Sequence, residues 1–228
     1  MVRPNARSSP PLPTRRSRAG QRGFSLIELI VVVIIIAVLA ALAIPSITSR
    51  MRDRRTQQAA HEVMNLYRTA RMRAMGRGSA VLVRYDAGSI PEGEIRVLEA
   101  IRGTGGADPN CDRLPVNGCQ LTTWTDGTDA AQIELFNPSV RGEYSGVQTV
   151  VTGPPPTDNN AKSQMDVCFT PMGRAFVRYA QAGPFQPLTG VPVADVWRKG
   201  TDNNPIGLTR QVMILPNGHA RMGVSGAP

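Results

Sequence analysis

A run of sixteen consecutive apolar residues, Leu29–Ile44, constrains the fold of this chain more strongly than any other feature. The longer segment Phe24–Ile47 has twenty-four residues, which in a helix would span about 36 Å and so cross a bilayer. The sequence therefore predicts a transmembrane helix near the N-terminus, followed by enough chain for one domain of ordinary size.

The positive charge of the chain is concentrated on both sides of this run. The formal net charge is +9, but residues 1–23 hold six arginines and no acidic residue, and residues 50–77 hold eight arginines against two acidic residues. The remainder is close to neutral. This distribution favours a membrane anchor over a uniformly basic nucleic-acid binder, and the N-terminal arginines predict a cytoplasmic N-terminus with an exported remainder.

Two ordinary export signals compete with a retained anchor. The small residues Ala41–Ala43 after an apolar run resemble a secretory cleavage site. The pair Arg15–Arg16 suggests a twin-arginine signal, although Arg18 stands where that signal needs an apolar residue. The run is longer than the roughly 7–15 apolar residues of a cleaved signal, which favours the anchor.

A single carboxylate, Glu28, lies inside the apolar segment, four residues after Phe24. A carboxylate in hydrocarbon costs on the order of 3 kcal/mol. An export signal gains nothing from this cost, so we expect Glu28 to have a partner.

The segment Arg22–Glu28, Arg-Gly-Phe-Ser-Leu-Ile-Glu, resembles the processing site of type IV prepilins and type II secretion pseudopilins. The resemblance implies that a prepilin peptidase cuts after Gly23, that Phe24 becomes the N-methylated N-terminus, and that the helix remains as the anchor. Cleavage creates an ammonium group in the apolar phase, and Glu28 of a neighbouring subunit can neutralise it, because two charges that are each costly alone become tolerable as a pair.

Pro45 falls at the position where this family usually has a proline, and we expect it to bend or loosen the helix. Ala37 departs from the family pattern, because many major pilins have a glycine there. The predicted organisation has four parts: a cleaved leader at 1–23, the transmembrane helix at 24–47, an amphipathic continuation of that helix at 48–77, and a β-rich domain at 78–228.

After Pro45 the apolar residues recur at helical spacing and predict a helix that continues to about Gly78. Its predicted buried stripe consists of Ala59, Val63, Leu66, Tyr67, Ala70 and Ala74. We interpret the arginines on the other face of this helix as a surface that contacts solvent or lipid headgroups.

From Ser79 the period changes to two, which predicts strands. The expected strands lie near 81–85, 95–99, 132–136, 147–151, 165–170, 174–179, 210–215 and 219–222. Long turn-rich loops are expected at 103–128, 152–162 and 180–209. Two hairpins share a Pro-x-Gly turn, Pro171–Gly173 and Pro216–Gly218. The fold class is therefore α+β and pilin-like: one long N-terminal helix packed on antiparallel sheets.

The chain has three cysteines. Cys111 and Cys119 enclose a short, turn-rich loop, so we predict a disulfide between them in an oxidising compartment. Cys168 lies in an apolar run and reads as a small core residue.

The helix segment His61–Gly76, the following strand and the closing hairpin Val212–Arg221 resemble the GspH/FimT branch of minor pseudopilins. This resemblance implies a minor subunit that helps to initiate or cap a type II secretion pseudopilus or a type IV pilus. Some FimT-like proteins bind DNA during uptake through a C-terminal Gly-Arg-x-Arg stretch. Here Gly218–Arg221 carries His219 in place of the first Arg, so the alternative is a DNA-binding uptake subunit that uses a set of four residues: Arg174, Arg210, His219 and Arg221.

No residue pattern predicts an enzyme, a cofactor or a metal site, because the two histidines lie on dissimilar elements and no phosphate-binding glycine motif follows a strand. The expected partners are prepilin peptidase, other pilins or pseudopilins through the N-terminal helix, the membrane, and in the alternative reading DNA. The expected location is the bacterial inner membrane, crossed once, with the C-terminal domain in the periplasm or the filament.

Overall fold

The structure is a computed structural model, and its first helix is its longest element. It describes residues 23–88, 90–101, 118–119, 124–140, 142–154, 160–181, 183–202 and 204–225. The chain divides into two compact units, Met1–Ile47 and Thr48–Pro228. Residues 1–22 of the predicted leader and Cys111 lie outside the described residues.

Helix α1 runs from Leu26 to Arg77. Its first part is long and apolar enough to cross a membrane, and none of that apolar stretch is buried within the protein. The helix continues through Pro45, and the bend expected there stays a prediction.

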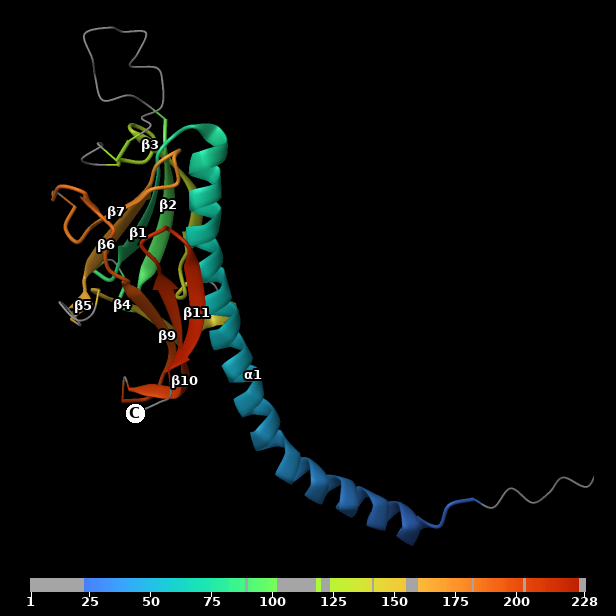
Figure 1. Cartoon of the computed structure of the whole chain (residues 1–228). Coiled ribbons are helices and arrows are strands. Elements are labelled where there is room, and N and C mark those ends of the chain that lie inside the picture. Colours follow the sequence, from blue (N-terminus) through green and yellow to red (C-terminus); the bar gives the residue numbers. More distant parts are fainter. Residues whose placement is uncertain are drawn as a thin grey trace, which may run out of the picture. The chain divides into compact units, whose positions relative to one another are not determined.

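The second part of α1 runs alongside the β-rich domain (Figure 1). It packs there through the predicted stripe, every member of which is buried. Glu99 on the neighbouring strand fixes the end of the helix, because its carboxylate accepts a hydrogen bond from Arg73 Nε at 2.6 Å and lies 3.2 Å from Arg77 Nε. The amphipathic pattern therefore identified the buried face of this half correctly.

Eleven strands among the described residues form two antiparallel sheets. In the six-stranded sheet, called sheet A, the spatial order is β3 (Ala130–Phe136), β2 (Glu94–Ala100), β1 (Val81–Asp86), β6 (Gln164–Phe169), β7 (Ala175–Arg178) and β8 (Gln186–Pro187). In the five-stranded sheet B it is β11 (Ala220–Ser225), β10 (Pro205–Ile214), β9 (Val193–Lys199), β4 (Val147–Thr152) and β5 (Ala161–Lys162). A short 3₁₀ turn, Gly142–Tyr144, precedes β4.

The main core lies between α1 and the two sheets, and alternation along β1 decides which side chains enter it. Val81, Val83 and Tyr85 belong to this core, whereas Leu82 belongs to a second, smaller core on the other face of sheet A. A hydrogen bond links the sheets, because the Tyr85 hydroxyl donates to the Thr149 carbonyl oxygen at 3.0 Å. The α+β prediction, one long N-terminal helix on antiparallel sheets, is confirmed.

The expected loop at 180–209 is wrong, because it contains β8, β9 and the first half of β10. Strand β9 is central in sheet B, between β10 and β4. Its alternation of buried Ala194 and Val196 with more exposed neighbours is regular. The Pro and Gly residues around it favoured a loop, and the pairing on both sides overrides that local preference.

The two Pro-x-Gly hairpins converge on one side chain of α1, Arg71. Arg71 Nε lies 3.5 Å from the Gly173 carbonyl oxygen in the first turn. In the second turn, a Cβ added at Gly218 would lie 3.1 Å from Arg71 Cδ. The repeat seen in the sequence thus corresponds to two turns, one from each sheet, that close against the same arginine.

Candidate functional site

The candidate processing site lies where the chain enters α1. Gly23, Phe24 and Ser25 precede the helix, which begins at Leu26, and the Phe24 side chain is 83% exposed. The peptide bond between Gly23 and Phe24 is therefore outside the helical hydrogen-bond ladder. An enzyme can reach this bond without unwinding the helix.

Ser25 caps the helix, and Glu28 lies in its first turn. The Glu28 backbone N–H donates to Ser25 Oγ at 3.2 Å, and the Leu29 N–H donates to the Ser25 carbonyl oxygen at 3.2 Å. A carboxylate near a helix N-terminus interacts favourably with the helix dipole. Glu28 is exposed and forms no ion pair with any described residue, so its carboxylate is open to a group outside this chain.

The first part of α1 exposes apolar side chains around its whole circumference. Ile30 and Val31, the most protected of its large apolar residues, are still 44% and 48% exposed, and Leu42 is 72% exposed. A helix that is apolar on all sides needs lipid or other apolar helices around it. This apolar surface is what a membrane anchor requires, and Glu28 adds one charged side chain to it.

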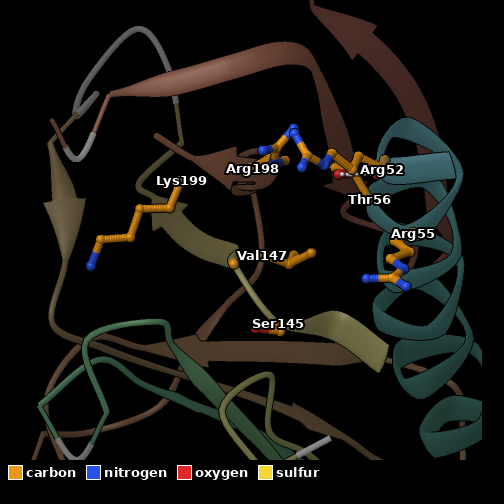
Figure 2. A pocket seen from close by; sticks show the side chains of 8 residues that line it. Arg52, Arg55, Thr56, Ser145, Val147, Arg198 and Lys199 are labelled. Atoms are coloured by element: carbon orange, nitrogen blue, oxygen red, sulfur yellow. Dashed lines mark hydrogen bonds between the residues drawn. The ribbon is translucent and has the colours of Figure 1, made fainter. Parts of the chain in front are cut away.

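A basic pocket of about 260 Å³ lies in the β-rich unit (Figure 2). Arg52, Arg55 and Thr56 line it from α1, and Arg198 and Lys199 line it from the end of β9. The remaining lining residues come from the turn into β4: Ser145, Gly146 and Val147. Four of the lining residues are cationic, and the lining comes from three separate segments of the chain.

The four candidate DNA contacts do not have equal access to solvent. Arg174, His219 and Arg221 are exposed. Arg210 is held inside the fold, because its Nη2 lies 3.3 Å from Asp53 Oδ2 and its side chain is only 12% exposed. The structure therefore leaves three of the four candidates with free access to a phosphate backbone.

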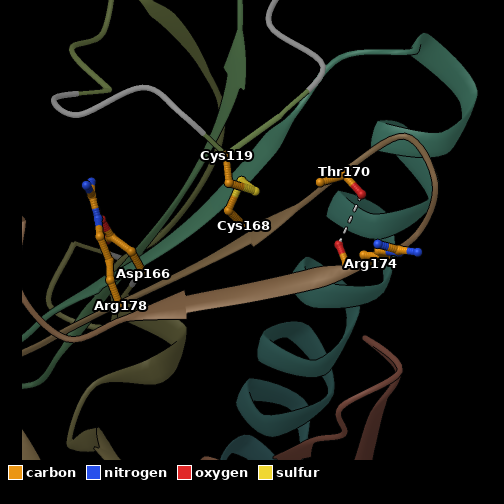
Figure 3. The surroundings of a disulfide bond; sticks show 6 residues. All are labelled: Cys119, Asp166, Cys168, Thr170, Arg174 and Arg178. Atoms are coloured by element: carbon orange, nitrogen blue, oxygen red, sulfur yellow. Dashed lines mark hydrogen bonds and ion pairs between the residues drawn. A yellow bond between two sulfur atoms is a disulfide. The ribbon is translucent and has the colours of Figure 1, made fainter. Parts of the chain in front are cut away.

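The predicted disulfide between Cys111 and Cys119 is wrong, because Cys119 is bonded to Cys168 (Figure 3). Their Cα atoms are 6.0 Å apart, and 49 residues separate them along the chain. Close spacing in sequence suggested the first pairing, but spacing carries no information on which strand lies next to Cys119 in the fold. Cys168 on β6 points to the second core, where Cys119 packs, so Cys168 is a bridging residue rather than a lone core thiol.

A buried charge cluster lies beside this disulfide on the same face of sheet A. Asp166 on β6 accepts hydrogen bonds from Arg84 Nε and Arg178 Nε, each at 2.9 Å (Figure 3 shows Asp166 and Arg178). All three residues are buried. Arg178 is thus committed to a structural ion pair with Asp166.

Residues 18–44 match one family model, described as the prokaryotic N-terminal methylation motif. This chain carries a prepilin-type signal. The matched range contains Gly23, Phe24 and Glu28 and ends at Ile44, the last residue of the long apolar run. No curated protein and no solved structure matches the chain.

The signal supports a type IV pilin-like or pseudopilin-like role in a pilus or in secretion. Such a signal implies processing by prepilin peptidase and assembly with other pilins. Together with the hydrophobic helix it fits a membrane-anchored protein that crosses the membrane once. These statements confirm the coarse part of the prediction made from the residues around Glu28.

Sequence reasoning predicted the methylation motif that the family model matches but missed the basic pocket. The arginines at 52 and 55 were visible as part of a basic stretch, but Arg198 lies in a segment read as a loop. If Val193–Lys199 had been predicted as a β-strand, Arg198 would have been placed near the end of that strand. Only the register of the sheets brings that strand end beside α1.

Proposed function

We propose that the chain is a minor pilin or pseudopilin, processed after Gly23, that helps to initiate or cap a type IV pilus or a type II secretion pseudopilus. The observation that carries the proposal is the methylation motif at 18–44, which leads directly into a helix with apolar side chains exposed on all sides. The resemblance of the helix segment His61–Gly76, the following strand and the closing hairpin Val212–Arg221 to the GspH/FimT branch adds the minor-subunit role.

In this proposal prepilin peptidase cuts between Gly23 and Phe24, which lie outside the helix. The new N-terminal Phe24 is methylated, and its ammonium group enters an apolar environment as helices pack. The exposed Glu28 of a neighbouring subunit neutralises that ammonium group. The pairing removes most of the cost of two isolated charges, so assembly favours subunits in one register.

The proposed location follows from the same segment. The arginine-rich leader stays in the cytoplasm until it is removed, the apolar part of α1 crosses the inner membrane, and the β-rich domain lies in the periplasm or filament. The disulfide between Cys119 and Cys168 supports a periplasmic location of the β-rich domain, because disulfides persist in the oxidising periplasm.

The first test is the N-terminus of the mature protein purified from membranes. Mass spectrometry of the N-terminal peptide should identify N-methylated Phe24. A mature chain that begins at Ile44 would instead mean that Ala41–Ala43 is an ordinary signal-peptidase site, and the proposal would then be wrong.

The second test is incorporation into filaments. Glu28→Leu should leave cleavage and membrane levels unchanged, since the cut lies outside the helix, but should strongly reduce recovery of the subunit in sheared filament fractions. Ser25→Ala is the matched control, because it removes the cap at the same end of α1 and keeps the carboxylate. Equal incorporation of Glu28→Leu and the wild type would contradict the role of Glu28 in assembly.

A further inference from the structure

Three arginines of the basic pocket have no acidic partner in the part of the chain that the structure describes. Arg52, Arg55 and Arg198 form no ion pair with any residue that the structure describes, whereas Lys199 Nζ lies 4.0 Å from Glu92 Oε1. Unpaired arginines around one concave surface are a favourable arrangement for a phosphate group, because guanidinium groups donate paired hydrogen bonds to its oxygens.

The size of the pocket limits its ligand. At about 260 Å³ it is smaller than the roughly 300–1,000 Å³ of sites for drug-sized ligands. The pocket suits a single phosphate-sized group rather than a whole nucleotide or cofactor.

An exposed apolar side chain lies directly beside Arg198, and two more lie on the same pair of strands. Ile206 on β10 is the register partner of Arg198 on β9, and it is 48% exposed. Leu208 and Val224 on the adjoining part of β10 and β11 are 43% and 54% exposed. A basic pocket bordered by exposed apolar side chains matches a membrane interface, where lipid phosphates lie next to acyl chains.

The position of the pocket in the chain points to the same ligand. Arg52 and Arg55 follow Ile47, the end of the apolar segment, by only five and eight residues. Basic residues that closely follow a transmembrane segment interact with anionic lipid headgroups. The strand end with Arg198 and Ile206 adds to these two arginines a part of the fold that lies far away in the sequence.

We propose that this pocket binds the phosphate headgroup of an anionic membrane phospholipid, with Ile206 and Leu208 against the acyl region. The inference goes beyond the proposed function, because it concerns the subunit while it still resides in the membrane. A bound lipid would hold the β-rich domain at the bilayer surface before the subunit enters a filament.

The test uses the full chain in a neutral detergent, with native mass spectrometry to measure bound lipid. The probes are phosphatidylglycerol, phosphatidylcholine and the soluble headgroup analogue glycerol phosphate. We expect phosphatidylglycerol to bind tightly and both other probes to bind weakly. Equal binding of phosphatidylcholine would overturn the proposal, and so would equal binding of glycerol phosphate, which would make the pocket a site for small anions.

Variants locate the site. Arg55→Gln and Arg198→Gln should each weaken phosphatidylglycerol binding about fivefold, as expected for one arginine at an anionic surface. Arg174→Gln is the matched control: it removes the same charge beside Arg71, which lies about 24 Å from Arg55 along the helix. Equal affinity of wild type and Arg198→Gln would contradict the site.

Two further variants separate charge from folding and from apolar contact. Arg198→Lys keeps the positive charge and should retain most of the binding, which excludes a loss caused by misfolding. Ile206→Ser should weaken phosphatidylglycerol binding, whereas Met172→Ser, at a side chain that is 82% exposed in the Pro-x-Gly turn, should not.

Normal processing and filament entry of an Arg198→Gln subunit would leave the proposed function intact whether or not lipid binding is lost.

Discussion

Cys119 and Cys168 are joined by a disulfide that ties Cys119 to strand β6 in the second core of sheet A. Cys168 is fully buried in the second core, together with Leu82, Leu98 and Trp124. The bond closes this small core from the side that α1 does not cover.

Loss of this disulfide should destabilise the β-rich unit. Closing a loop of 49 residues restricts the unfolded chain by about 4 kcal/mol in the entropic model. We therefore expect the double variant Cys119→Ser, Cys168→Ser to lose roughly 2–4 kcal/mol in the free energy of unfolding. Denaturant titration of the full chain in neutral detergent measures this loss, and Cys111→Ser is the control that should change little.

Peptide mapping without reduction distinguishes the two pairings directly. Trypsin should cut after Arg113, so Cys111 and Cys119 fall in different peptides. We expect the peptide 114–141 to be linked to the peptide 163–174. A link between the peptides 103–113 and 114–141 would contradict the observed pairing.

Gly93 should tolerate no side chain, because it lies in the turn that joins β1 to β2 and meets sheet B. Its φ is +81°, and an added Cβ would lie 2.5 Å from the Thr149 carbonyl oxygen. Gly93→Ala should cost at least about 2 kcal/mol, from the left-handed backbone and the overlap together. The midpoint of denaturant unfolding measures the cost.

Gly127→Ala provides the control for Gly93, because its φ of +76° is similar and no atom lies within 4 Å of the added Cβ. It should cost only about 1 kcal/mol, from the backbone alone. Equal losses in the two variants would mean that the contact with Thr149 does not constrain the turn.

Sequence reasoning succeeded where a property is local. The apolar run, Glu28 and the spacing from Ala59 to Ala74 each report on one helix, and the structure places them as expected. It failed where distant segments meet. The partner of Cys119, the ion pair of Arg210 with Asp53 and the assignment of β9 all depend on the register between strands or between a strand and α1. Spacing along the chain contains no record of that register.

Binding of duplex DNA should not depend on Arg221. On the C-terminal hairpin Arg210 is paired with Asp53, which leaves Arg221 as the one exposed arginine among the described residues of that hairpin. We expect Arg221→Ala to bind a labelled duplex as weakly as the wild type does at physiological salt, because each phosphate contact contributes only a part of the affinity. Fluorescence anisotropy measures this binding. Salt-dependent binding that is lost in Arg221→Ala would favour the DNA-uptake alternative.

The pH dependence of stability should reveal the environment of Asp195 on β9. Burial raises the pKa of Asp195 above 3.8, and a hydrogen bond from Gln211 Nε2 to Asp195 Oδ1 at 2.9 Å partly opposes this rise. The folded state therefore holds the proton more tightly than the unfolded state. The contribution of Asp195 to the free energy of unfolding then falls as pH rises from 3.8 through the raised pKa.

Asp195→Asn keeps an acceptor for Gln211 and removes the titration. Its melting temperature relative to the wild type should therefore increase from acid to neutral pH, since only the wild type carries a half-buried charge at neutral pH. Asp195→Ala, which also removes the acceptor, should be less stable than Asp195→Asn at every pH, because it leaves Gln211 Nε2 without this bond. Thermal unfolding of the three proteins between pH 3 and pH 8 measures both effects, and a relative melting temperature that decreases toward neutral pH would show that the folded protein favours the ionised carboxylate.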